Sequence, residues 1–374
     1  MPTTKLVMGL GFGDEGKGKT VSYLASLGSP DKLIIRFHGG HQAGHTVQFG
    51  DKHHVFSSYG SGTLQGMHSY ISRFCTVYPF ALLNEWTDLM KLVNPIVIWI
   101  DPLCQITTPF DVSVNQRIEA VNQHGSCGVG FGTTIGRSEQ HFNLFAQDLF
   151  YPSVLRGKLD NIMMYYRSNA QPDWESKKQE FLNDVECMLS KVIISPPQFK
   201  SYNEIIFEGA QGILLDQQFG FFPNVTRSYC TSRNALKLIK EFELNAPYIY
   251  YVHRMYQTRH GVGFMTNEGL APTLINNEKE TNVRNSWQGK FRKGMLDVDL
   301  MRYALACDSH FHSNAATLVL TCADQVGKTF PGTTRGKVME YTPRSLFDEL
   351  QDTNPYLCHL LVSECPETTQ VYAG

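Results

Sequence analysis

The stretch Lys5-Leu-Val-Met-Gly-Leu-Gly-Phe-Gly-Asp-Glu-Gly-Lys-Gly-Lys-Thr20 decides the fold of this chain. Its apolar first part, Lys5–Leu10, is typical of a strand that is covered on both faces of a parallel sheet. The glycines that follow can bring backbone N–H groups close to an anion, and a helix that starts at Lys17–Leu27 adds a favourable partial charge. We therefore predict a strand–loop–helix unit whose loop binds phosphate, with Lys17 and Lys19 as cations.

Two alignments of this loop stay open on the residues alone. The segment Gly13–Thr20 fits the Walker A pattern of nucleotide-binding P-loops, with Lys19 as its lysine. The segment Asp14–Lys17 fits instead a GDEGKG loop, in which Lys17 faces the phosphate. A carboxylate repels phosphate, so Asp14 makes sense at this place only with a metal ion between the two or as a proton acceptor.

A second glycine-rich segment, Phe37–Thr46, follows the predicted strand Lys32–Phe37 and reads FHGGHQAGHT. Its three histidines have a spacing that suggests a metal site, but the glycines between them break the helix that would align the rings. We expect a flexible loop that brings one histidine to a phosphate. The glycine-rich stretch Gly125–Gly136 is also expected to be a loop.

The remaining chain alternates strand-like and helix-like segments, which is typical of an α/β protein with a largely parallel central sheet. The clearest helix is Trp174–Ile193, whose apolar residues fall on one stripe. We predict a P-loop-like sheet flanked by helices in a single domain, residues 1–374, with smaller subdomains inserted as loops. Further predicted strands are Pro95–Asp101, Glu204–Glu208, Tyr248–Val252, Thr317–Thr321 and Leu360–Ser363, and further predicted helices are Ala81–Val93, Asn234–Phe242 and Asp297–Cys307.

The composition narrows the functional classes. The chain has 33 Lys and Arg against 35 Asp and Glu, so it lacks the basic surplus that nucleic-acid binding requires. No apolar run approaches the roughly 18 residues of a membrane span, and the acidic pair Asp14–Glu15 interrupts the apolar core of any signal peptide. Nine cysteines without a CxxC pair suit a reducing compartment. We expect a cytoplasmic protein with no nucleic-acid or membrane partner.

Two more blocks carry candidate functional residues. Phe207–Gly212 reads FEGAQG at the end of an apolar strand, and its Gln211 can both donate and accept hydrogen bonds toward a ligand. Leu214–Thr226 reads LLDQQFGFFPNVT. Taken singly, each block is equally compatible with a strand-to-turn transition that has no function.

Taken together and in this order, the blocks GFGDEGKGK, RFHGGHQAGHT, FEGAQGILLDQQFGFFPNVT and TRHGVG resemble the adenylosuccinate synthetase family. The last block runs from Thr258 to Gly263. The chain looks shorter than typical members, mainly between about residues 90 and 200. The resemblance implies a homodimeric ligase that condenses IMP with L-aspartate, using GTP and Mg²⁺, through a 6-phosphoryl-purine intermediate.

The resemblance also implies roles for single residues. Asp14 takes the purine N1 proton and binds the metal together with the Gly44 carbonyl, while His45 is the acid on the transferring phosphoryl group. Lys17 is the phosphate cation, and Gln211 holds the purine 6-oxygen. The other implied nucleotide and phosphate contacts are Gly13, Glu15, Gly16, Gly18, Lys19, Gln42, Ser126, Cys127, Arg137, Leu215, Thr226 and His260.

The loop that grips the amino acid departs from the family pattern. It reads SWQGKFRKG over Ser286–Gly294 and offers Gln288, Lys290 and Arg292 as ligands of aspartate. A lysine cannot reproduce the bidentate grip of an arginine on a carboxylate. Arg137 is the nearest counterpart of the family arginine that reaches the nucleotide of a neighbouring subunit.

The residues for the base of the triphosphate depart as well. The resemblance assigns Asp324, Ser363 and Cys365 to this base, because a carboxylate can accept from two adjacent donors of guanine. Cys322 stands where the family has a lysine. ATP therefore stays open as the donor beside GTP.

Three alternatives follow from these departures. The same chemistry can act on another purine monophosphate such as dGMP, or with another amino acid. A P-loop nucleotide switch can use Gly13–Thr20 with Asp101 as its Walker B carboxylate. A binder without catalytic turnover is the third alternative, and the intact pair of Asp14 and His45 counts against it.

Overall fold

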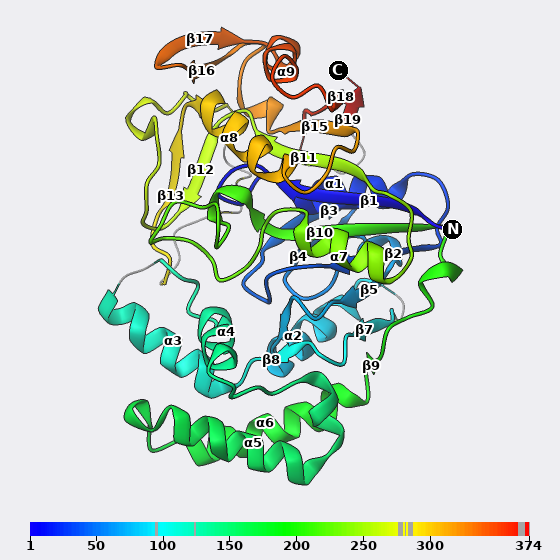
Figure 1. Ribbon diagram of the computed structural model, residues 1–374, viewed down its shortest axis with the longest axis vertical. Helices are drawn as coiled ribbons and strands as arrows, with labels where there is room; N and C mark the ends of the chain where they lie inside the picture. Colours follow the sequence, from blue (N-terminus) through cyan, green and yellow to red (C-terminus); the bar gives the residue numbers. More distant parts are fainter. Residues whose placement is uncertain are drawn as a thin grey trace.

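A computed structural model describes residues 1–93, 96–122, 125–275, 280, 282, 287–365 and 371–373 of the chain. Its centre is a ten-stranded sheet in which every described strand pair is parallel except the one at the β19 edge, so the predicted α/β fold is confirmed (Figure 1). The strand order is β19 (Val371–Ala373), β18 (Leu357–Ser363), β15 (Ala316–Thr321), β11 (Tyr248–Arg254), β1 (Thr3–Gly9), β10 (Glu204–Gly212), β2 (Lys32–Arg36), β5 (His68–Ile71), β7 (Ile98–Ile100) and β9 (Ile193–Ile194).

The central strands are apolar because helices cover both faces of the sheet. In β1, Leu6 and Met8 pack into one apolar cluster, while Val7 packs into another on the opposite face. Helix α1 (Lys17–Ser26) places Val21 and Leu24 in the cluster of Val7. Helices α7 (Arg233–Glu241) and α8 (Val298–Ser309) contribute to the larger cluster on the other side.

A second apolar core lies among the helices between β7 and β9. Figure 1 shows this helical region below the sheet. The predicted helix Trp174–Ile193 ends at Leu189, and the stretch Gly125–Gly136, expected to be a loop, is helical from Phe131 onward. The helices of this core are α3 (Pro109–Asn122), α5 (Pro152–Tyr165) and α6 (Trp174–Leu189), together with α2 (Pro79–Leu89), which precedes β7. Helix α4 (Phe131–Glu139) packs against α3.

Smaller sheets extend from the carboxyl edge of the central sheet. The hairpin of β3 (His45–Phe49) and β4 (Lys52–Phe56) begins at a residue that was expected to lie in a flexible loop. Other short elements are β6 (Thr76–Val77) with β8 (Gln105–Ile106), β12 (Gln257–His260) with β13 (Phe291–Gly294), and β14 (Leu296–Asp297) with β16 (Phe330–Thr334) and β17 (Lys337–Tyr341), next to α9 (Pro343–Gln351).

Two of the predicted segments reach beyond the described residues. Pro95, at the start of a predicted strand, and Ser286, in the predicted aspartate loop, lie outside them. Within the part of the chain that the structure describes, no helix combines the length and apolar character needed to cross a membrane. The loops that follow β1, β10 and β11 leave the same edge of the sheet, which is where ligands bind in parallel α/β sheets.

Candidate active site

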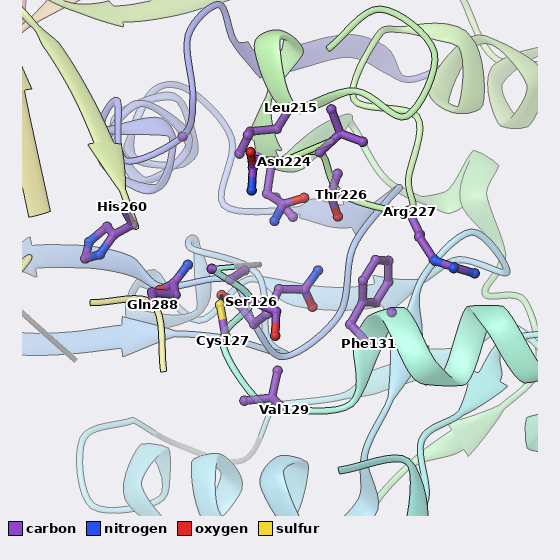
Figure 2. Close-up of a pocket in the computed structure, with 18 of the residues that line it drawn as sticks. Ser126, Cys127, Val129, Phe131, Leu215, Asn224, Thr226, Arg227, His260 and Gln288 are labelled. Atoms are coloured by element: carbon purple, nitrogen blue, oxygen red, sulfur yellow. Dashed lines mark hydrogen bonds between the residues drawn. The ribbon is translucent and has the colours of Figure 1, made fainter. Parts of the chain in front are cut away.

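A cavity of about 1500 Å³ opens at this edge of the sheet (Figure 2). Three segments that are far apart in the sequence bring Asp14 and Lys17, His45, and Gln211 to its wall. The other predicted site residues that line it are Gly13, Glu15, Gly16, Gly18, Gln42, Gly44, Ser126, Cys127, Arg137, Leu215, Thr226, His260 and Gln288. Those that are not among its lining residues are Lys19, Lys290, Arg292, Asp324, Ser363 and Cys365.

The glycine loop after β1 is held by its own buried carboxylate. Glu15 Oε1 accepts hydrogen bonds from the amides of Gly11 at 2.6 Å and Gly13 at 3.2 Å, and Lys17 Nζ donates to Glu15 Oε2 at 2.8 Å. Burial alone raises the pKa of Glu15, but Lys17, His253 and the Gly13 amide together outweigh that effect and the net pKa is lowered. Glu15 is therefore ionised at neutral pH, and its carboxylate stabilises the conformation of the glycine loop.

Asp14 has the opposite orientation to its neighbour. Its φ of +58° lies in the left-handed region, and its side chain stays 24% exposed at the cavity. The one ion-pair partner described for its carboxylate is the ring of His260, with Oδ2 and Nε2 3.4 Å apart. Asp14 is thus the carboxylate of the loop that remains available to a ligand.

His45 lies on β3, against the start of α1. A Cβ on Gly18 would lie 2.6 Å from the Cβ of His45, so only glycine permits this close approach. The Nδ1 of His45 lies 2.5 Å from Glu208 Oε1, and its Nε2 lies 3.3 Å from the carbonyl of Ala210. The position of the imidazole is therefore fixed by the end of β10 as well as by its own strand.

Glu208 is a residue of the candidate site that the sequence analysis did not identify. It is fully buried and accepts hydrogen bonds from the Ser61 amide at 3.0 Å and from the Ser61 hydroxyl. Burial raises the pKa of Glu208, but His45, Arg36 and Ser61 lower it to about 2 overall. Burial lowers the pKa of His45, and the Glu208 carboxylate opposes that shift. Its place in the FEGAQG block was the only sequence signal.

Several buried polar atoms of the cavity wall have no hydrogen-bond partner among the described residues. Both polar atoms of the Gln42 side chain, Oε1 of Gln211 and Nδ1 of His260 belong to this group. Buried polar groups in native proteins are nearly always satisfied by protein, water or ligand. The cavity is therefore built for a ligand rich in polar atoms.

The residues present fit a magnesium ion. Asp14 offers one carboxylate and Gly44 can offer its carbonyl, and both line the cavity. Within the described part of the chain, no group of three or more His, Cys, Asp or Glu side chains is arranged to hold a metal. Mg²⁺ commonly takes one or two carboxylates and completes its shell with water and substrate phosphates, so this sparse donor set suits it.

Arg137 is bound by residues of its own chain. Its guanidinium is fully buried and forms a bidentate pair with Asp111, at 2.8 and 3.1 Å. It also donates to the carbonyls of Ile106 at 2.6 Å and Phe142 at 2.5 Å. These bonds stabilise the packing of α3 against α4, and the expected contact of Arg137 with a neighbouring subunit's nucleotide stays a prediction.

The side chain of Arg292 is likewise bound by residues of its own chain. It forms a bidentate pair with Glu268, at 2.7 and 2.5 Å, and donates to the carbonyls of Gly261 at 2.8 Å and Gly263 at 2.9 Å. Arg292 does not line the cavity, and its assignment to the amino acid stays a prediction. The backbone carbonyl of Lys290 accepts from Gly261 at 3.0 Å, so of the three predicted aspartate ligands only Gln288 lines the cavity.

The residues predicted for the triphosphate base gather elsewhere at the same edge of the sheet. Lys19 Nζ donates to Ser363 Oγ and to the carbonyl of Cys365, beyond the end of β18. Asp324 follows β15, the neighbour of β18. These residues therefore flank one end of the glycine loop rather than the cavity itself.

The geometry favours one of the two alignments of the glycine loop. Helix α1 begins at Lys17, which lines the cavity, whereas Lys19 points toward β18. Asp101, the Walker B candidate, is buried and accepts from Tyr70 at 2.7 Å and from Arg73 at 3.0 Å, outside the cavity lining. The GDEGKG alignment therefore accounts for the site, and the P-loop switch alignment does not.

These features define an α/β protein with a glycine loop and a polar cavity at the carboxyl edge of its parallel sheet, where ligands bind in such folds. The chain belongs to the adenylosuccinate synthetase family, whose sequence model matches residues 6–355. It is 32% identical to adenylosuccinate synthetase of Neisseria meningitidis (strain Z2491) over 284 residues, 70% of this chain and 64% of that protein. The chain thus spans less than two thirds of the length of this relative. It is 27% identical to the Paraburkholderia phymatum enzyme over 398 residues, 99% of this chain and 85% of that protein.

Solved structures agree on the fold. The fully ligated adenylosuccinate synthetase of Plasmodium falciparum superposes with a TM-score of 0.79 at 16% identity, and 100% of both chains is covered. Succinoaminodeoxyadenylate synthetase of cyanophage S-2L, solved with dGMP and dATP, superposes with a TM-score of 0.65 at 15% identity, covering 100% of this chain and 95% of that chain.

Proposed function

We propose that this chain is a purine nucleotide ligase that condenses IMP with L-aspartate, driven by a nucleoside triphosphate, to give adenylosuccinate. Membership of the adenylosuccinate synthetase family supports this assignment. The observation that carries it is the convergence of Asp14, Lys17, His45 and Gln211 on one polar cavity. We take GTP as the donor, with ATP as the alternative, and we expect a homodimer in the cytoplasm.

The first half of the reaction activates the purine. Asp14 accepts the N1 proton, so that the 6-oxygen attacks the γ-phosphorus; the new O–P bond forms as the bond to the β-phosphate oxygen breaks, and the diphosphate leaves. Lys17 and His45 donate to oxygens of the transferring group, and Gln211 orients the purine 6-oxygen. Mg²⁺ held by Asp14 and the Gly44 carbonyl neutralises phosphate charge when it is bound.

The second half replaces the activated oxygen. The amine of aspartate attacks C6 and loses a proton, the C6–O bond breaks, and inorganic phosphate departs. His45 is placed to stabilise that leaving phosphate, since its ring is held by Glu208 at the cavity wall. Gln288 is the predicted amino-acid ligand that lines the cavity.

A second acceptor has a specific observation in its favour. The amino-acid ligands of the cavity are altered, with Arg292 committed to Glu268, so the substrate side has changed more than the phosphoryl-transfer side. The cyanophage S-2L neighbour was solved with dGMP and dATP. We therefore keep dGMP as an alternative acceptor and ATP as an alternative donor.

The test is a matrix of IMP or dGMP, aspartate, and GTP or ATP, with the product weighed by mass spectrometry and phosphate release measured alongside. We expect phosphate release only when monophosphate, aspartate and triphosphate are all present, with a product heavier than the monophosphate by one aspartate less one water. Phosphate release from triphosphate alone would favour a nucleotide switch. Binding without any product would favour a non-catalytic binder.

A further inference from the structure

We propose that Arg227 is the cation that binds the phosphate of the nucleoside monophosphate, and that Glu139 restrains it until this dianion binds. The inference rests on the proposed function and assigns a positively charged ligand to one of its substrates. It concerns a side chain that none of the four motif blocks includes, at the rim of the same cavity.

The other cationic side chains of the cavity wall are already committed. Lys17 is paired with buried Glu15, and Arg137 with buried Asp111. In the proposed mechanism Lys17 serves the transferring phosphoryl group of the triphosphate. A monophosphate dianion at Arg137 would compete with the buried carboxylate of Asp111, which is costly to leave unpaired. Arg254 is bound to Glu280 at 2.5 Å and to the Asp14 carbonyl, and Arg259 donates to the carbonyls of Val262, Phe264 and Asn224.

Arg227 differs from these cations. Its side chain is 55% exposed, and the hydrogen bond described for it joins Nη1 to Glu139 Oε2 at 3.0 Å. Glu139 is itself 57% exposed, and ion pairs between such exposed groups are weak. A dianion that makes a bidentate contact with a guanidinium can therefore displace this carboxylate.

The position of Arg227 matches the predicted phosphate contacts. It directly follows Thr226, and Figure 2 shows both side chains leaving the same segment above the helix that begins at Phe131. The loop that carries Ser126 and Cys127 contacts the Gln42 segment through a hydrogen bond from Cys127 Sγ to the Gln42 carbonyl, at 3.9 Å. The predicted phosphate contacts Gln42, Ser126 and Cys127 therefore adjoin one another, and Thr226 and Arg227 line the same cavity.

Gly136 on α4 gives the guanidinium room to move between its two partners. A Cβ at this position would lie 2.9 Å from Arg227 Nη1, so the guanidinium rests against bare backbone. From this place it can turn from Glu139, one helical turn further along α4, to a phosphate in the cavity. The monophosphate site is then completed by a residue of the same chain.

The experiment compares four variants by steady-state kinetics and by calorimetric titration with the monophosphate and with its nucleoside. Arg227→Gln should raise the KM and Kd for the monophosphate by about 10- to 100-fold, because hydrogen bonds to a charged group are lost. The KM values for triphosphate and aspartate should stay within about twofold, and the affinity for the nucleoside should not change. Arg344→Gln is the matched control, since Arg344 forms a similarly exposed ion pair with Asp348.

Glu139→Gln should have the opposite effect on the affinity for the monophosphate. It should lower the monophosphate Kd by about two- to fivefold by releasing Arg227. In the Arg227→Gln background the same change should have no effect. Unchanged monophosphate binding in Arg227→Gln, with a folded protein and active wild type, overturns the inference. A wild type that binds monophosphate through Arg227 but forms no product would refute the proposed function and leave this inference standing.

Discussion

At the scale of single residues, the site depends on an imidazole that a buried carboxylate holds in place. Glu208 Oε1 lies 2.5 Å from His45 Nδ1, and its other oxygen is tied to the Ser61 amide. Glu208→Gln keeps the shape but removes the charge that orients and stabilises a protonated His45. We expect kcat to fall by about 10- to 100-fold, less than the roughly 10²- to 10⁴-fold that a general acid contributes, because His45 itself is still present. Glu204→Gln, on the same strand but paired with Lys5 and Lys32, is the control and should leave kcat within about twofold.

The same carboxylate predicts a pH dependence of stability. Its pKa in the folded chain, about 2, is depressed from 4.5, so it stabilises the fold above the unfolded value, and this contribution is lost as the pH falls toward about 2. Urea unfolding between pH 5 and about pH 3 should therefore show a smaller loss of unfolding free energy in Glu208→Gln than in wild type. Equal losses in both proteins would contradict the assigned charge of Glu208.

At the scale of elements, the glycine loop and α1 distinguish two lysines that are two residues apart. Lys17 opens the helix at the cavity, and Lys19 reaches Ser363 beyond β18. Because Lys17→Met leaves Glu15 buried without its partner, the double variant Glu15→Gln/Lys17→Met is the cleaner test. We expect it to reduce kcat by at least about 100-fold. Lys19→Ala should mainly raise the KM of the triphosphate. If Lys19→Ala abolished activity while the double variant stayed active, the Walker A alignment of the loop, with Lys19 as the phosphate cation, would be the correct one.

The α3–α4 contact gives a prediction on stability. Arg137→Met leaves Asp111 buried without its cation, which should cost about 3 to 5 kcal/mol in the free energy of unfolding. Arg227→Gln, at an exposed ion pair on the same cavity, should change that free energy by less than about 0.5 kcal/mol. Denaturant unfolding monitored by circular dichroism measures both. A small effect of Arg137→Met would show that Asp111 finds other partners.

At the scale of the whole molecule, the sequence predicts the parallel sheet well because its strands are buried on both faces and read as apolar runs. The sequence does not predict α3, because the buried face of this helix carries Asp111, Asn115 and Glu119. These polar residues interrupt the apolar stripe that would indicate a helix. These polar side chains bind Arg137 and the loop at Ser126.

The candidate site, like the fold, is predicted from the sequence only in part. Asp14, Lys17, His45 and Gln211 are predicted because they stand inside dense motifs. The sequence does not reveal the ion pairs of Arg137 and Arg292, because their carboxylate partners, Asp111 and Glu268, are 26 and 24 residues away in the sequence. The proposed role of Arg227 depends on α4. The sequence analysis did not predict this helix because its segment is rich in glycine.

The central claim is that Asp14 and His45 act on one phosphoryl group that travels through the purine 6-oxygen. IMP labelled with ¹⁸O at C6 tests it most directly, with the released phosphate analysed by mass spectrometry. The account predicts one labelled oxygen in each phosphate released with product, and no labelled phosphate from Asp14→Asn. Unlabelled phosphate released together with product would contradict it.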